Sequence, residues 1–196
     1  MIDRSRITGV ILAGGRATRM GQRDKGLERF RDAPLAAHAL ERLAPQVATT
    51  VISANRHLDA YAALGPPVVA DTIAGHAGPL AGFAAVLDHC ETDYLAAVPC
   101  DAPFFPLDLV ARLGRVLETG TAHTLAYART ASRTHPVFSL VSRTLAPSLI
   151  AYLGDGGRAV RGWIATVDAI AVDFDDEAAF GNLNTIAELR QAEDRG

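Results

Sequence analysis

Short apolar segments alternate with segments of helical periodicity along almost the whole chain, and this alternation is the strongest constraint on the fold. Residues 7–12 have the length and β-branching of a buried strand. Residues 80–89 repeat apolar side chains with the spacing of a helix that faces a core. The segments expected as strands are 7–12, 48–53, 68–70, 94–98, 124–128, 136–140 and 169–174, and those expected as helices are 35–43, 57–64, 80–89, 106–118, 142–153, 158–165 and 185–193.

An alternation of this kind predicts an α/β fold in which helices cover both faces of a mainly parallel sheet, giving three layers. The strands at 124–128 and 136–140 are joined by too few residues for a helix, which predicts one antiparallel hairpin in a mixed sheet. Pro106 suits the first turn of its helix, and Thr185 with Glu188 has the spacing of a capping box for the last helix. No repeat or linker interrupts the pattern, so the whole chain, residues 1–196, is expected to form a single domain.

Composition and charge exclude several classes of function. The apolar runs are all shorter than the ~18 residues that a membrane span needs. A formal net charge of -3 argues against a nucleic-acid polymer as the main partner. The residues before the first strand leave no room for a signal peptide, and Cys90 and Cys100 form no C-x-x-C motif. We therefore expect a cytoplasmic protein with two reduced thiols and with no membrane or nucleic-acid partner.

A loop directly after the first expected strand concentrates positive charge. Gly14 and Gly15 allow the backbone to turn and to approach a ligand closely. Four cations follow within ten residues, namely Arg16, Arg19, Arg23 and Lys25. The loop is not a Walker A motif, because Gly26 and not Ser or Thr follows Lys25, and the chain lacks the dinucleotide-binding fingerprint. Backbone N–H groups and fixed cations converge on phosphate oxygens, so the loop predicts a phosphate site of another kind.

Polar residues follow three further strands of the expected sheet. They are Ser53 to Arg56, Asp71 with Thr72, and Pro99 to Asp101. In open α/β sheets, ligands bind beyond the carboxyl ends of the parallel strands. These residues and the basic loop are therefore expected to face one binding crevice.

The same residues lie in motifs that resemble those of the molybdenum cofactor guanylyltransferases, within the nucleotidyltransferase group that also makes activated sugars. The matching pieces are Leu12-Ala-Gly-Gly15, Arg19-Met-Gly21, Asp24-Lys-Gly26, Ala54-Asn-Arg-His57, Gly78-Pro-Leu-Ala-Gly82, Pro99-Cys-Asp101, His135-Pro136 and Asn182-Leu-Asn184. They occur in order and cover nearly the whole chain. The combination is specific, whereas the first motif alone is not.

The resemblance implies a Rossmann-like nucleotidyltransferase fold and the transfer of GMP from GTP to molybdenum-molybdopterin, with release of pyrophosphate. It implies a nucleotide-binding part at about 7–105 and a pterin-acceptor part at about 106–190. Such a reaction needs positioned phosphates and neutralised charge rather than covalent catalysis by protein groups. The expected cofactor is Mg2+, with Mn2+ as a substitute, and transient contacts with cofactor-inserting or cofactor-delivering proteins are expected.

The resemblance also implies roles for individual residues. The nucleotide-binding candidates are Leu12, Ala13, Gly14, Gly15, Lys25, Ser53, Asn55, Asp71 and Asp101. The catalytic candidates are Lys25, Asp101 and Arg19, and the metal ligand is Asp101. The acceptor-binding candidates are Gly82, Arg158, Asn182 and Asn184.

This chain departs from its relatives at a few of these positions. Relatives often carry Asn where this chain has Ser53, which makes Asn55 a candidate substitute. Larger sugar nucleotidyltransferases have a late acidic metal ligand where this chain offers Asn182 and Asn184. We therefore expect one magnesium ion held mainly by Asp101 and by phosphates.

Asp71 matches a position that binds the guanine nucleotide in the family. Our hypothesis is that its carboxylate accepts hydrogen bonds from the N1–H and N2–H₂ of guanine, an edge that adenine does not offer. The alternative is that Asp71 merely ends the strand at 68–70 and caps the loop that follows.

Three other functions remain open at this point. A cytidylyltransferase that acts on the same cofactor usually carries L-A-A-G where this chain has Leu12-Ala-Gly-Gly15, so the motif favours GTP. A sugar-1-phosphate nucleotidyltransferase is disfavoured by the short chain and by the lack of the late acidic ligand. A non-catalytic nucleotide-binding chaperone for the cofactor is disfavoured by the presence of Lys25 and Asp101.

Overall fold

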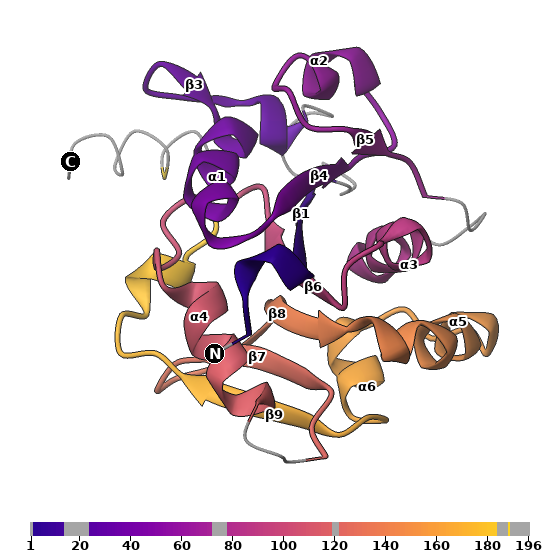
Figure 1. Ribbon diagram of the computed structural model, residues 1–196. Helices are drawn as coiled ribbons and strands as arrows, with labels where there is room; N and C mark the ends of the chain where they lie inside the picture. The colour runs from indigo at the N-terminus through magenta and orange to yellow at the C-terminus, as the bar shows by residue number, and fades with distance from the viewer. Residues whose placement is uncertain (1, 14–23, 72–77, 119–121, 184–187, 189–196) are drawn as a thin grey trace.

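The computed structural model describes residues 2–13, 24–71, 78–118, 122–183 and 188. Its centre is a seven-stranded sheet with the strand order β5-β4-β1-β6-β8-β7-β9 (Figure 1). The strands are β1 (Ile7–Leu12), β4 (Thr49–Ser53), β5 (Val68–Val69), β6 (Tyr94–Pro99), β7 (Leu125–Arg129), β8 (Thr134–Ser142) and β9 (Ala169–Asp173). β8 pairs antiparallel with both of its neighbours, whereas the remaining neighbours in the sheet pair parallel. The mixed, mainly parallel sheet and its hairpin are therefore confirmed.

Helices cover both faces of this sheet (Figure 1). They are α1 (Leu35–Leu43), α2 (Leu58–Ala62), α3 (Pro79–His89), α4 (Leu109–Leu117), α5 (Ala146–Gly154) and α6 (Val160–Ile164). Side chains of β1 alternate between two cores, because successive residues of a strand point to opposite faces. Ile7 and Ile11 pack with α1 and α4, while Val10 and Leu12 pack with α3, α5 and α6. The three-layer arrangement predicted from the alternation is confirmed.

Short elements complete the described structure. The 3₁₀ turns are Arg4–Arg6, Lys25–Leu27, Ala44–Gln46, Arg143–Leu145 and Ala178–Phe180. A small hairpin, β2 (Arg29–Phe30) with β3 (Ala33–Pro34), precedes α1 and was not expected, because strands of two residues show no alternation in the sequence. No helix in the described ranges is both long and apolar enough to cross a membrane. Cys90 and Cys100 are both buried free thiols.

Several expected helix boundaries were wrong. α4 begins at Leu109, so Pro106 lies in the preceding turn, where its carbonyl oxygen accepts from the Leu109 N–H at 3.1 Å. α2 is shorter than expected at its start, because His57 adopts a left-handed backbone with φ 52°. The segment expected as one helix from Ser142 begins with the end of β8 and a 3₁₀ turn before α5. Most of the last expected helix, at 185–193, lies outside the described residues.

Candidate active site

The ends of three parallel strands meet at one edge of the sheet. In the strand register, Leu12 of β1 lies opposite both Ser53 of β4 and Pro99 of β6. Two hydrogen bonds extend this pairing past the strands, from the Ala13 N–H to the Ser53 carbonyl at 2.8 Å and from the Cys100 N–H to the Leu12 carbonyl at 3.2 Å. The segments that leave these strands therefore start side by side, as the sequence predicted.

Lys25 and Asp101 face each other at this edge. The Lys25 Nζ lies 3.4 Å from the Asp101 Oδ2, and the two side chains are 28% and 14% exposed. Burial raises the pKa of Asp101 above its ordinary value, and the Lys25 ammonium opposes part of that rise. Lys25 therefore compensates only part of the cost of burying a charged Asp101 carboxylate. A further cation at this place would stabilise the charged form.

Asn55 and Asp71 form a reciprocal pair beside the ends of β4 and β5. The Asn55 Nδ2 donates to the Asp71 Oδ2 at 2.6 Å, and the Asp71 N–H donates to the Asn55 Oδ1 at 2.8 Å. Burial raises the pKa of Asp71, and the hydrogen bond from Asn55 opposes the rise. The structure therefore brings together two of the residues that were assigned to the nucleotide.

Gly82, which was expected in the acceptor site, packs against the ends of β1 and β4. A Cβ at Gly82 would lie 2.5 Å from the Ser53 Oγ and 2.9 Å from the Leu12 Cδ2. Any larger residue would push α3 away from β1 and β4, so glycine here permits their close approach. Its predicted contact with the acceptor remains a prediction.

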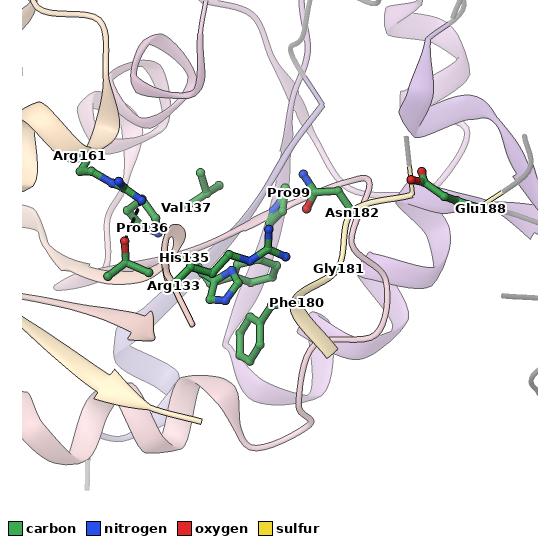
Figure 2. Close-up of a pocket in the computed structure, with 12 residues that line it drawn as sticks. Pro99, Arg133, His135, Pro136, Val137, Arg161, Phe180, Gly181, Asn182 and Glu188 are labelled. Carbon is green, nitrogen blue, oxygen red and sulfur yellow. Dashed lines mark hydrogen bonds between the residues drawn. The ribbon is translucent and has the colours of Figure 1, made fainter. Parts of the chain in front are cut away.

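A cavity of about 550 Å³ lies on the other side of the β6 end (Figure 2). This volume is within the range of small-molecule sites. The cavity, named here the β8 pocket, is lined by Pro99, Arg133, Thr134, His135, Pro136, Val137, Phe138, Arg161, Phe180, Gly181, Asn182 and Glu188. Pro99, the last residue of β6, thus lines this pocket and lies two residues before Asp101.

An irregularity in β8 opens the β8 pocket. The pairing of β6 with β8 runs only as far as Ala97 opposite Ser139. In the pairing of β7 with β8, the register jumps from Ser139 to His135 across a single step of β7. Residues 136–138 fall between these pairs, and Pro136 has no N–H to donate to a neighbouring strand. The strands β6 and β8 therefore separate where the cavity begins.

The β8 pocket combines cations with an aromatic stack. Figure 2 shows Arg133 and His135 close together, with Arg161 toward one end and Asn182 toward the other. The His135 ring stacks on Phe180 with centroids 4.8 Å apart, and its Nε2 lies 3.1 Å from the Thr130 Oγ1. Burial and the neighbouring Arg133 lower the pKa of His135, which favours a neutral imidazole. The pocket therefore suits an anionic ligand that also has flat or polar parts.

The segment after Phe180 connects the β8 pocket to Asp101. The Leu183 N–H donates to the Asp101 carbonyl oxygen at 2.7 Å. Asn182, the residue just before it, lines the pocket. The β8 pocket therefore adjoins the segment that carries Asp101.

The structure separates the predicted acceptor residues. Asn182 lines the β8 pocket, whereas the Arg158 Nη1 donates to the backbone carbonyl oxygens of Leu153 at 3.3 Å and Gly157 at 2.7 Å. Arg158 thus supports the turn between α5 and α6. The candidates Gly14, Gly15, Arg19 and Asn184 lie outside the described residues.

Sequence reasoning missed two cations of the β8 pocket. Arg133 stands two residues before the His135-Pro136 motif, so its proximity to a recognised motif was an available signal. Arg161 lies on α6, where it donates through Nη2 to the Thr134 Oγ1 at 3.0 Å. No pattern in the sequence indicates that α6 packs beside the start of β8.

Comparison with known proteins identifies the family. Residues 9–170 match the MobA-like NTP transferase domain. The chain belongs to this family. A molybdenum cofactor guanylyltransferase of Bordetella petrii is 52% identical over 195 residues, covering 97% of this chain and 99% of that protein. A molybdenum cofactor guanylyltransferase of Ralstonia nicotianae is 49% identical and both chains are covered in full. The family resemblance predicted from the motifs is confirmed.

Solved structures support the fold of this MobA-like protein. The molybdopterin-guanine dinucleotide biosynthesis protein A of Archaeoglobus fulgidus has a TM-score of 0.78 at 20% identity, over 96% of this chain and 97% of that one. A CMP:2-keto-3-deoxy-manno-octonic acid synthetase complexed with CTP has a TM-score of 0.76 at 13% identity, with 98% of both chains covered. The nucleotidyltransferase fold expected from the sequence is confirmed.

Proposed function

We propose that this protein transfers GMP from GTP to molybdenum-molybdopterin, forming the guanine dinucleotide cofactor and pyrophosphate. The observation that carries the proposal is the arrangement around β6. A lysine–carboxylate pair and a basic pocket lie on either side of the same strand end, so two phosphate-bearing substrates can meet at Asp101. The full-length similarity to molybdenum cofactor guanylyltransferases supports this choice of substrates.

The nucleotide would bind on the side of β1, β4 and β5, in the part of the chain at about 7–105. The Lys25 ammonium lies where it can neutralise phosphate charge, and Asp71 carries a carboxylate oriented by Asn55. In the reaction, an oxygen of the terminal phosphate of the acceptor attacks the α-phosphorus of GTP, and the bond to the β-phosphate breaks. Catalysis then depends on alignment and on charge stabilisation in the transition state.

Asp101 fits the role of a magnesium ligand. Its carboxylate offers the hard oxygen donors that Mg2+ prefers. Burial disfavours the charged form of this carboxylate, and the Lys25 ammonium compensates only part of that cost. Among the described residues, no group of three or more His, Cys, Asp or Glu side chains could hold a metal, which is consistent with phosphates completing the coordination. When bound, the ion would neutralise charge on the triphosphate and on the departing pyrophosphate. Rv0371c from Mycobacterium tuberculosis, a protein of similar fold with a TM-score of 0.69 at 21% identity, has been solved as a complex with manganese.

The acceptor would bind in the β8 pocket, in the part of the chain at about 106–190. Arg133 and Arg161 supply cations for its phosphate and other anionic groups, and Asn182 supplies an amide beside Asp101. The neutral His135 ring, stacked on Phe180, supports the floor of the pocket. We further propose that the enzyme works in the cytoplasm, where its two buried thiols stay reduced.

Mass spectrometry of the product tests the proposed function. Purified protein is incubated with Mg2+, molybdenum-loaded molybdopterin and either GTP, CTP or ATP, and pyrophosphate is measured in parallel. We expect the guanine dinucleotide product and one pyrophosphate per product with GTP. A product formed from CTP instead would indicate a cytidylyltransferase, and nucleotide binding without pyrophosphate release would indicate a non-catalytic cofactor chaperone.

A further inference from the structure

A buried tyrosine hydroxyl lies beneath the turn that carries Lys25. Tyr61 is on α2, is 0% exposed, and belongs to the hydrophobic core cluster that also contains side chains of α1 and α4. Its hydroxyl donates to the Asp24 Oδ1 at 2.5 Å, across 37 residues of sequence. Burial raises the pKa of Tyr61 strongly, so the hydroxyl stays protonated and remains a donor.

Asp24 determines the start of the Lys25 turn. It is the N-cap of the 3₁₀ turn Lys25–Leu27, where its Oδ1 also accepts from the Gly26 N–H at 3.3 Å. Its carbonyl oxygen accepts from the Leu27 N–H at 3.1 Å. One carboxylate oxygen thus joins the turn to α2, because Gly26 and Tyr61 donate to the same atom.

Gly26 lets the turn sit directly on this support. A Cβ at Gly26 would overlap the Tyr61 hydroxyl and would lie 3.2 Å from the Cys100 Sγ. Cys100 immediately precedes Asp101, so the turn packs against both the tyrosine and the segment that carries the carboxylate. From this turn the Lys25 side chain reaches Asp101, with 3.4 Å between Nζ and Oδ2.

We propose that Tyr61 is a positioning residue for nucleotidyl transfer, whose hydroxyl acts through Asp24 to hold the Lys25 turn in place beside Asp101. The inference rests on the proposed function, since it assumes that Lys25 takes part in turnover. A tyrosine that only satisfied a partly buried carboxylate would affect stability, whereas a positioning tyrosine affects turnover through Lys25. These two roles give different results in a double-mutant cycle.

The first measurement compares Tyr61→Phe with Tyr127→Phe, which removes a hydroxyl from β7, at the far side of the sheet from α2. Tyr61→Phe keeps the buried ring and removes one hydrogen bond to a charged group, so we expect kcat to fall about tenfold. We expect the KM for molybdenum-molybdopterin to stay within twofold, and Tyr127→Phe to keep the wild-type kcat. Equal kcat in Tyr61→Phe and wild type would overturn the inference.

The deciding measurement repeats Tyr61→Phe in a Lys25→Ala background, with enzyme in excess so that slow turnover can be followed. We expect less than a twofold further loss, because the residue through which Tyr61 acts is already gone. A tenfold loss in both backgrounds would show that the hydroxyl acts independently of Lys25 and would overturn the inference.

A second pair of variants covers the case in which Tyr61→Phe fails to fold. Asp24→Ala should reproduce the tenfold loss, and Asp24→Asn, which keeps an oxygen acceptor for Tyr61, should recover most of it. Equal losses in Asp24→Ala and Asp24→Asn would contradict the inference.

The wild-type reaction separates the two proposals. If the wild-type protein is inactive with GTP, the proposed function is refuted. If the wild-type protein is active and the variants are unaffected, only the role of Tyr61 is refuted.

Discussion

The ends of β1, β4 and β5 with the residues that follow them, named here the strand-end side, and the β8 pocket lie on the two sides of β6 in the sheet, but they are built by different means. On the strand-end side, parallel strands in regular register bring their ends together, and Asn55, Asp71 and Asp101 each lie two residues beyond the end of β4, β5 and β6, respectively. On the pocket side, an antiparallel strand loses its register and leaves three residues without a regular partner on β7. A regular sheet edge thus positions the groups that we propose to bind phosphate, and an irregular strand makes room for the pocket that we propose for the acceptor.

The comparison predicts that loss of Asp101, which lies between the two sides, has the largest effect. Asp101→Ala should reduce turnover by about three orders of magnitude or more at saturating Mg2+, because a metal in this role contributes several kcal/mol of transition-state stabilisation. Pyrophosphate release measures the effect. Asp101→Asn serves as the fold control: it removes a carboxylate whose ionised form is disfavoured by burial, so its melting temperature should not fall below that of wild type. Near-normal product formation by Asp101→Ala would show that the metal is held elsewhere.

Substitution of Lys25 tests the strand-end side alone. Lys25→Ala should reduce turnover by about two to three orders of magnitude, as expected for loss of one preorganised charge donor. The KM for the acceptor should stay close to that of wild type, because the β8 pocket is unchanged. Single-turnover kinetics at saturating GTP provide the measurement. A change in rate of less than about fivefold would show that Lys25 is a structural partner of Asp101 and takes no part in turnover.

Substitution of Asp71 tests whether the strand-end side selects the base of the nucleotide. Asp71→Asn replaces a carboxylate, which can accept two hydrogen bonds from guanine, by an amide with one acceptor oxygen and one donor group. The charge-assisted hydrogen bonds to guanine are then lost, so the ratio of GTP to ATP affinity should fall about a hundredfold. Titration of wild type and variant with both nucleotides gives this ratio. An equal weakening of GTP and ATP would indicate that Asp71 only supports the loop that follows β5.

The preference for GTP should also depend on pH through Asp71. Only the ionised carboxylate accepts both hydrogen bonds, and burial raises the pKa of Asp71 above its ordinary value of 3.8. The ratio of GTP to ATP affinity in wild type should therefore start to fall on acidification at a higher pH than an exposed aspartate would give. In Asp71→Asn the ratio should show no such decline over the same range.

The β8 pocket should respond with the smallest and most selective effects. Arg133→Ala and Arg161→Ala should each raise the KM for molybdenum-molybdopterin about tenfold, the cost of one charge-assisted contact, while the affinity for GTP stays unchanged. Arg115→Ala, which removes an exposed cation on α4, is the matched control and should leave both constants unchanged. Parallel weakening of GTP and acceptor by the pocket variants would contradict the division into two sides.

The difference between the two sides also explains what the sequence could predict. Strands such as β1 have a clear length and composition, and their ends fix where Ser53, Asp71 and Asp101 lie. The β8 pocket depends on a register jump between Ser139 and His135, and on a helix, α6, that places Arg161 beside it. Such features come from tertiary packing, and neither periodicity nor turn chemistry reports them.

Two further residues illustrate the same limit. Arg158 was expected to bind the acceptor, and its contact with the acceptor remains a prediction, but the sequence did not show that its guanidinium donates to backbone carbonyls of its own turn. Tyr61 was expected only as part of a helix, since nothing local relates it to Asp24, a residue far away in the sequence. A motif gives the identity of a residue, whereas the partner of its side chain is known only once the chain has folded.

The hydrogen bond from Leu183 to Asp101 has a consequence for the order in which the molecule is completed. All strands of the large sheet have been synthesised once the chain reaches Asp173, the last residue of β9. The segment that binds the Asp101 carbonyl and carries Asn182 into the β8 pocket is made only afterwards. A chain that ended at Asp173 would therefore keep the residues of every strand of the large sheet but would lose the hydrogen bond from Leu183 to Asp101 and the Asn182 side chain that lines the β8 pocket.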